Sequence, residues 1–406
     1  MTQSSFATIL FLAWRGCKQY AFSSLVAAFT IAMAGGLFLS TWKLKNEANQ
    51  SFSEAAGGFD AVLGARGSKL QLILNSLFHL EASPGNLSWE QYELIKSTRG
   101  IREAFPLAVG DNYMGYRLVG TLPDLFLKHE WKAGKKYAIE QGGRVFSEMA
   151  KEALVGSFVA QKLGLKIGDQ FHPYHGLTFR EESKHEDLYL VVGILEPTGT
   201  PADRVIWIPI KGIQMMEGHD QSMAQSVSAV LLSLKGSAGF HLDLKYNKQG
   251  NQATLAWPIA STLSRFFEKL NWFEQILSMV SYLVALIGTL IITATLRTVM
   301  NERTREFAIL RCLGATRIQI TSIVLGQSIL ISIFGIFGAC VTFFGIHAGA
   351  TQLIREQTGV LMKGISFDQV SVYVFVVILT LGLISGLIPA IQAYRISLSE
   401  NLKPSS

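Results

Sequence analysis

The chain has 406 residues, of which 49% are hydrophobic and 16% are charged. It is too apolar for a soluble enzyme of this length and too mixed for a protein buried entirely in lipid. Its net charge of +6 would suit a nucleic-acid-binding protein, but the excess of Lys and Arg gathers in short stretches beside apolar runs. We therefore expect no nucleic-acid partner.

Four runs lack Asp, Glu, Lys and Arg, and each is long enough to cross a bilayer as a helix. They are residues 19–42, 275–296, 318–354 and 369–394. The stretch between the second and third runs and the stretches beside both chain ends are basic, which places them in the cytoplasm. We predict an α-helical membrane protein with four transmembrane helices and a large extracytoplasmic α+β domain between the first and second helices.

The predicted organisation has three parts. Residues 1–45 hold an N-terminal interfacial helix and the first transmembrane helix, and residues 46–270 form the outer domain with its stalk helices. Residues 271–406 hold the other three transmembrane helices. Both chain ends are then expected in the cytoplasm, and the protein in the cell inner membrane, where it contacts lipid directly.

The first transmembrane run has an alternative interpretation. Residues 1–18 place most of their apolar side chains on one helical face, which is typical of a helix lying in the inner interface. The triplet Ala32-Met33-Ala34 resembles the cleavage site of a signal peptide. We favour an uncleaved anchor, because the charge-free run continues to Trp42, an aromatic residue suited to the membrane interface.

The connector between the second and third runs, residues 297–317, carries five Arg and two Glu. Phe307, Leu310 and Leu313 recur in it at helical spacing, with charged residues between them. This pattern predicts a short amphipathic helix on the cytoplasmic side of the membrane.

The end of this predicted helix is also marked. Gly314 is a natural C-terminal stop, and Thr316-x-x-Gln319 fits a capping box that begins the next helix. From these features alone, the helix could rest on lipid headgroups or dock on another protein.

The sequence of the connector, NERTREFAILRCLGATRIQI, resembles the coupling segment of FtsX/MacB-type ABC transporter permeases. In that family the segment docks on a separate ATPase subunit. The resemblance therefore implies an ATPase-coupling role for the matching positions. They are Arg303, Glu306, Phe307, Leu310, Arg311, Leu313, Gly314 and Ala315.

The resemblance extends to other parts of the chain. The sequence ALVGSFVAQKLGLKIGDQFH, residues 153–172, is similar to the MacB-like periplasmic core domain of these permeases, and the last three spans would form the FtsX-like domain. The C-terminal sequence of the chain also resembles that of the family. It departs from the family pattern at Leu398, where the family has proline, and at Lys403, where the family has arginine. Residues 212–256 fit least well, and there we predict only a strand at 229–234.

The resemblance implies a non-catalytic permease that couples ATP hydrolysis on a partner chain to movement of its own outer domain. Export, extraction of lipoproteins or peptides, and mechanotransmission are the expected roles. ATP and Mg²⁺ would bind to the partner ATPase. A second permease copy or a paralogue would complete a dimer, and a periplasmic or lipid-anchored protein is a further candidate partner. The alternatives are a membrane-anchored receptor or scaffold without an ATPase, and a metal-handling outer domain.

The residues themselves give no reason to expect ATP hydrolysis by this chain, because no Walker A motif occurs in it. The nearest candidate, Gly64-x-x-Gly67-Ser68-Lys69, lacks the required spacing. We predict a strand at 59–63 and turn residues at both glycines.

One histidine cluster in the predicted outer domain could bind zinc. His172-x-x-His175 is followed by His185, with several carboxylates nearby. Pro173 and Gly176 make this segment a loop, so no helical face fixes the ligand geometry. We therefore predict a polar surface hairpin without a metal, and keep the three histidines as weaker candidate ligands. The outer domain contains no cysteine, which excludes a disulfide framework there.

Small residues in the last two spans are predicted to allow close packing of helices. They are Gly335, Gly338, Gly345, Gly349, Gly382 and Gly386.

Overall fold

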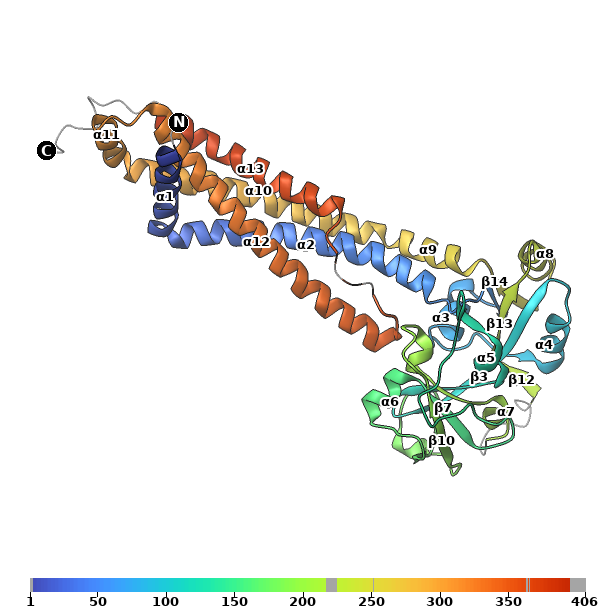
Figure 1. Cartoon of the computed structure of the whole chain (residues 1–406). Helices are drawn as coiled ribbons and strands as arrows, with labels where there is room; N and C mark the ends of the chain where they lie inside the picture. Colours follow the sequence, from blue (N-terminus) through green and yellow to red (C-terminus); the bar gives the residue numbers. More distant parts are fainter. Residues whose placement is uncertain (1–2, 217–224, 251, 363, 365, 395–406) are drawn as a thin grey trace. The chain divides into compact units, whose positions relative to one another are not determined.

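The computed structural model describes residues 3–216, 225–250, 252–362, 364 and 366–394. Contacts divide the chain into two compact units. The helical unit comprises the described parts of Met1–Asn46, Leu270–Ala350 and Gly364–Ser406, and the sheet unit comprises those of Glu47–Lys269 and Thr351–Lys363. Figure 1 labels the elements of both units.

The helical unit contains long helices, as the sequence predicts. Its elements are α1 (Gln3–Gln19), α2 (Ala21–Glu54), α10 (Asn271–Glu302), α11 (Thr304–Cys312), α12 (Arg317–Thr358) and α13 (Gln369–Tyr394). Among the described residues, α2, α10, α12 and α13 are long and apolar enough to cross a membrane. The four predicted spans are therefore confirmed as helices of membrane-spanning character.

Two of these helices are longer than the roughly 20 residues that a bilayer requires. The helix α2 has 34 residues and α12 has 42. Each runs without interruption from the helical unit into the sheet unit, to which the ends at 47–54 and 351–358 belong. The predicted stalk after the first span is thus the continuation of α2 itself.

Glycines bring α12 close to two neighbouring helices of the bundle. A Cβ atom at Gly335 would lie 2.6 Å from the side chain of Ile31, and one at Gly338 would lie 2.6 Å from Ala32, both in α2. On the other side, Gly382 and Gly386 of α13 face serines of α12. The close packing predicted for these four glycines is therefore present.

For Gly345 and Gly349, close packing against another helix stays a prediction. A side chain at either position would meet nothing within 4 Å among the described residues. Spacing places these two glycines along α12 but carries no information about which helix lies beside them. Among the residues that the structure describes, no helix approaches these two glycines closely.

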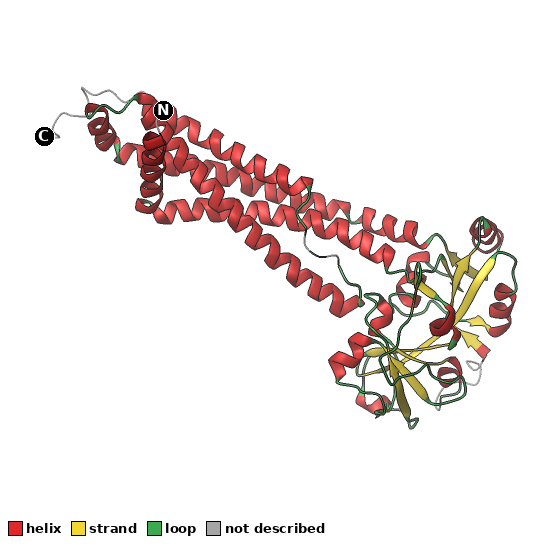
Figure 2. Cartoon of the chain, in the orientation of Figure 1, coloured by secondary structure: helices red, strands yellow, loops and turns green. Residues whose placement is uncertain are grey.

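The sheet unit is built on one large mixed sheet, drawn in yellow in Figure 2. The strand order is β14-β1-β13-β3-β4-β11-β7-β10-β8, with β9 paired to β3. The strands are β1 (Ala61–Ala65), β3 (Ile101–Tyr113), β4 (Tyr116–Thr121), β7 (Glu152–Val155), β8 (Gln170–Phe171), β9 (Tyr174–His175), β10 (Tyr189–Ile194), β11 (Ile206–Pro209), β13 (Ala229–Leu234) and β14 (Ala253–Ala256).

Two small sheets and several short helices complete this unit. The small sheets pair β2 (Leu87–Ser88) with β12 (Ser226–Val227) and β5 (Glu130–Lys132) with β6 (Lys135–Lys136). The helical elements are α3 (Lys69–Ser76), α4 (Trp89–Lys96), α5 (Asp124–Lys128), α6 (Ser157–Leu163), η1 (Glu181–Ser183), η2 (Pro201–Arg204), α7 (Ile210–Gln214), α8 (Ala238–Asp243), η4 (Leu244–Gln249) and α9 (Ile259–Lys269).

Both faces of the large sheet are buried. Along β1, Val62 points into one hydrophobic core, whereas Ala61 and Leu63 point into a second core on the opposite face. Helices cover both faces, so this is the α/β layering expected for a self-contained domain.

The strand and turn predicted around Gly64 need one correction. Gly64 lies inside β1, where it pairs with Ala229 and Thr254, so it is a strand residue. A glycine suits this strand position because α3 packs closely against it. The Leu72 side chain of α3 occupies the space that a Cβ at Gly64 would need. Gly67 lies in the turn, as predicted.

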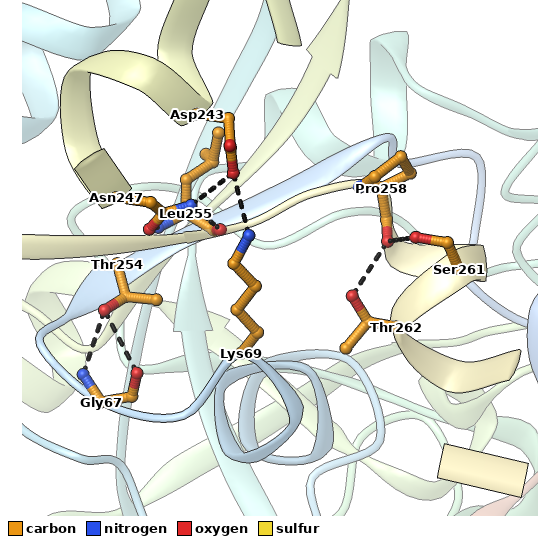
Figure 3. Close-up of polar contacts among 9 residues, drawn as sticks. All are labelled: Gly67, Lys69, Asp243, Asn247, Thr254, Leu255, Pro258, Ser261 and Thr262. Atoms are coloured by element: carbon orange, nitrogen blue, oxygen red, sulfur yellow. Dashed lines mark hydrogen bonds and ion pairs between the residues drawn. The ribbon is translucent and has the colours of Figure 1, made fainter. Parts of the chain in front are cut away.

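The segment after this turn is held by side-chain contacts within the sheet unit (Figure 3). Thr254 Oγ1 accepts from the Gly67 amide over 3.1 Å, and Lys69 Nζ lies 2.9 Å from Asp243 Oδ1. The amide and the lysine that a phosphate-binding loop would direct at its ligand thus both have protein partners here.

Candidate functional site

The helix α11 and its two turns form the candidate site, because they contain all the residues singled out in the connector. At its C-terminal end the Gly314 amide donates to Arg311 O over 3.1 Å, and the Ala315 amide donates to Leu310 O over 3.0 Å. This is the Schellman pattern, and it requires the left-handed conformation that Gly314 adopts with φ of 98°. The predicted stop is confirmed.

The next helix starts with the predicted capping box. Thr316 Oγ1 accepts from the Gln319 amide over 3.2 Å, and Gln319 Oε1 accepts from the Thr316 amide over 2.8 Å. The two caps leave a short turn between α11 and α12 in which the amides of residues 313–316 all donate hydrogen bonds. The direction of α11 is therefore fixed relative to the start of α12.

Arg303 fixes the other end of α11. Its Nε–H donates to Glu306 Oε2 over 2.7 Å, and its guanidinium lies 5.1 Å from the centre of the Phe307 ring. Arg303 is buried, and a Cβ atom at Gly16 of α1 would lie 3.0 Å from its Nη1. The arginine thus lies close to α1 and orients Glu306.

One face of α11 is buried against the helix bundle. Phe307 is fully buried in a cluster with residues of α10, α12 and α13, and Leu310 and Ala315 pack against the same cluster from its edge. A force applied to α11 would therefore act directly on the ends of the long helices.

Leu313 departs from the prediction. We expected it on the apolar face with Phe307 and Leu310, but it is 80% exposed. The physical reason is the helical period: six residues separate Phe307 from Leu313, which is about 600° of rotation at 3.6 residues per turn. Leu313 therefore points away from the buried face.

The opposite face of α11 carries the exposed residues. Glu306, whose side chain is 52% exposed, lies on it with Arg305, and the apolar side chains of Ile309 and Leu313 follow one and two turns later. Cys312 is exposed next to them. We call this surface the α11 outer face. It combines one carboxylate, which accepts a hydrogen bond from Arg303, with two exposed aliphatic side chains.

Sequence reasoning did not predict that Ile309 and Cys312 are exposed on this face. It also did not predict that Arg303 lies against α1. A helical-wheel count from the buried Phe307 would have placed Ile309 on the exposed side. The contact of Arg303 with α1 joins residues almost 290 positions apart, and a local pattern does not contain that information.

The histidine cluster has a different membership from the predicted one. His175 Nδ1 and His185 Nε2 each lie 3.4 Å from Oδ1 of Asp111, a residue of β3. His172 is not part of this group, because its Nδ1 lies 3.0 Å from the carbonyl oxygen of Asp187. The predicted polar hairpin is thus anchored on a buried carboxylate that the sequence pattern did not indicate.

The family-like C-terminal segment with Leu398 and Lys403 lies outside the described residues.

Comparison with known proteins connects α11 to a family. Residues 278–398 match the model of the family described as FtsX-like permease C-terminal, and this range contains all of α11. None of the curated proteins matches the chain.

Two solved structures are similar to the chain. One is the periplasmic region of MacB from Actinobacillus actinomycetemcomitans, with 10% identity, a TM-score of 0.35, and coverage of 53% of this chain and 94% of that chain. The other is the extracellular domain of the noncanonic ABC-type transporter YknZ from Gram-positive bacteria, with 14% identity, a TM-score of 0.29, and coverage of 48% and 97%. At these TM-scores neither likeness decides the fold, which rests on the topology described above.

Proposed function

Because residues 278–398 match the model of the FtsX-like permease C-terminal family, we propose that the chain is the membrane subunit of an ABC transporter and works with a separate ATPase subunit. In this proposal the chain itself has no catalytic role. ATP and Mg²⁺ bind to the partner, and two membrane subunits, either two copies or a copy and a paralogue, form the complex. The complex lies in the cell inner membrane with both chain ends in the cytoplasm.

The α11 outer face is the observation that carries this proposal. Leu313 and Ile309 are exposed on a helix whose other face is already packed, and Glu306 lies between them and the arginine that orients it. Anionic headgroups disfavour a carboxylate at this position, whereas a groove on a protein can take the carboxylate and both aliphatic side chains together.

The packing of α11 supports a mechanical role. Phe307 joins α11 to the cluster formed by α10, α12 and α13, and the Schellman turn joins it to the first residue of α12. The helix α12 continues for 42 residues, and its last part belongs to the sheet unit. We propose that closure of the ATPases moves α11, and that α12 carries this movement to the sheet unit outside the membrane.

Such movement suits export from the outer side, extraction of a lipoprotein or peptide, or control of an outer partner. The outer partner could be a periplasmic or a lipid-anchored protein. Finding which molecules bind the sheet unit while the ATPase is active would identify this partner and the substrate.

The test is affinity purification of the full-length chain from its own membranes in mild detergent. The proposal expects a copurified chain that contains Walker motifs and ATP hydrolysis in the purified sample. A preparation that is folded and stable but contains no ATPase, even after cross-linking in the membrane before extraction, would favour the receptor or scaffold and contradict the transporter.

A further inference from the structure

A cluster of three potential metal ligands lies in the sheet unit, far along the chain from the candidate coupling site. Asp111 of β3, His175 of β9 and His185, two residues after η1, offer one ligand atom each, and these atoms all lie within 4.8 Å of one another. Asp111 and His185 are buried, whereas His175 is 57% exposed.

The main chain positions all three residues. Asp111 and His175 are register partners in the antiparallel β3–β9 pair, so their side chains leave the sheet side by side. The neighbouring Asn112 supports this pair, because its side-chain amide donates to the carbonyl oxygens of Tyr174 and Gly176 over 3.3 and 2.9 Å.

His185 is brought back to the same place by the hairpin. Its amide donates to Pro173 O over 2.8 Å, and a β-bridge joins Tyr174 to Lys184. The loop character of this segment, which made a metal site appear unfavourable from sequence, is therefore compensated by strand pairing on both sides of the cluster.

The distances within the cluster fit a small transition-metal ion. Zinc binds imidazole nitrogen at about 2.0–2.1 Å and carboxylate oxygen at about 2.0–2.2 Å, so tetrahedral geometry separates two ligand atoms by about 3.3–3.5 Å. Both observed separations from Asp111 Oδ1 to a histidine nitrogen are 3.4 Å. We propose that Asp111, His175 and His185 form a binding site for a divalent transition-metal ion of the zinc class.

The chemistry of the three groups agrees with this assignment. Two imidazoles and one carboxylate form a borderline ligand set that suits zinc better than Mg²⁺ or Ca²⁺, which prefer oxygen ligands. Asp111 is fully buried, and a buried carboxylate needs a positive charge beside it. The exposure of His175 leaves this side of the cluster open to solvent.

The bound ion would tie the 173–185 hairpin to the long strand β3. None of its residues belongs to the helical unit, which contains α11. Its effect would be to stabilise the part of the sheet unit that contains β8 and β9.

The test is metal binding by the full-length chain, purified in detergent and stripped of metal with a chelator. The probe is Zn²⁺, measured by isothermal titration and by metal content after dialysis. The wild-type chain should bind one equivalent in a site that His175→Ala and His185→Ala each weaken by at least about tenfold. His175→Ala is the more informative variant, because an exposed side chain can be removed with little risk to folding.

His172→Ala is the matched control, since His172 lies in the same hairpin but outside the cluster. It should leave the affinity and the stoichiometry of Zn²⁺ unchanged. Absence of binding by the wild-type chain, or binding that His175→Ala and His185→Ala do not alter, would overturn the proposal. An equal loss in His172→Ala would overturn this choice of ligands. If Asp111 and the two histidines form only polar contacts with one another, no variant will differ from wild type in Zn²⁺ binding.

Discussion

Arg204 donates its Nε–H to the backbone carbonyl oxygen of Glu356 over 2.7 Å. This carbonyl lies in the last turn of α12, where the helix leaves its own C=O groups without partners. Burial lowers the pKa of the Arg204 guanidinium from its usual value. Next to it, Gly359 ends the helix with φ of 75° and packs against Pro201 and Arg204. The end of α12 is thus capped by a partly buried arginine of η2.

Replacing this arginine should loosen the end of α12 without unfolding the chain. A hydrogen bond from a charged donor contributes about 1.5–3 kcal/mol, so Arg204→Ala should speed amide hydrogen exchange in residues 351–358 by at least about tenfold. The matched control is Lys162→Ala, which removes an exposed ion pair to the same Glu356 and should change exchange little. Equal exchange in wild type and Arg204→Ala would show that the cap does not hold the helix.

The two groups of glycines in the membrane helices should respond oppositely to valine. A Cβ at Gly386 would lie 2.8 Å from Ser328 Cβ, an atom that cannot rotate away, so Gly386→Val should destabilise the helical unit by about 1–3 kcal/mol. Gly345→Val, where the space is open among the described residues, is the control. Thermal unfolding in detergent should show a lower midpoint for Gly386→Val alone. Equal losses would mean that Gly345 has a neighbour outside this chain.

His79 should make the sheet unit sensitive to acid. Burial, helped by the positive charges of Arg117 and Arg204, lowers the pKa of His79 to about 3 from a usual value of 6.5. Below pH 6.5, His79 therefore binds a proton in the unfolded chain but not in the folded chain. The free energy of unfolding falls as the pH drops from 6.5 towards 3. Between pH 7 and 5 the loss attributable to this group is about 2 kcal/mol.

The measurement is the unfolding midpoint of the purified chain at both pH values, followed by tryptophan fluorescence. His79→Asn should show a smaller decrease than wild type, because asparagine does not titrate and tolerates the φ of 54° at this position. Parallel decreases in the two proteins would show that other groups cause the acid sensitivity.

The exposed native Cys312 offers a direct test of the proposed orientation. In a chain with Cys17 and Cys340 changed to serine, an impermeant thiol reagent should label Cys312 in inverted membrane vesicles and leave it unlabelled in intact cells. A cysteine introduced at Glu182 should show the opposite pattern. Labelling of both positions from the same side would contradict the placement of α11 in the cytoplasm.

Local patterns were sufficient for much of the helical unit. Charge-free runs located the four long helices, and Gly314 and Thr316 marked the turn between α11 and α12, because helix ends are encoded by a few neighbouring residues. The failures concern contacts between distant positions. Spacing could not show which helix, if any, of the described residues lies beside Gly345, nor that strand pairing would bring Asp111 beside histidines more than 60 residues later.

The central claim is that the α11 outer face binds an ATPase. Two substitutions test it through different chemistry. Glu306→Lys removes a carboxylate and reverses its charge, and loss of one member of a charge pair at an interface typically costs about 2–5 kcal/mol. Leu313→Ser removes an exposed aliphatic side chain that would become buried on docking, at about 1.5–3 kcal/mol. Because Leu313 and Arg303 flank opposite ends of α11, the effect of Leu313→Ser does not arise from loss of the Arg303–Glu306 contact.

The decisive measurement is the amount of ATPase that copurifies with each variant, together with the ATP hydrolysis of the sample per permease chain. Gln319→Ala, which removes only half of a helix cap, serves as the control and should match wild type within about twofold. We predict that Glu306→Lys and Leu313→Ser each insert normally but lose at least about tenfold in bound ATPase. Wild-type ATPase binding and hydrolysis in both variants would contradict the claim.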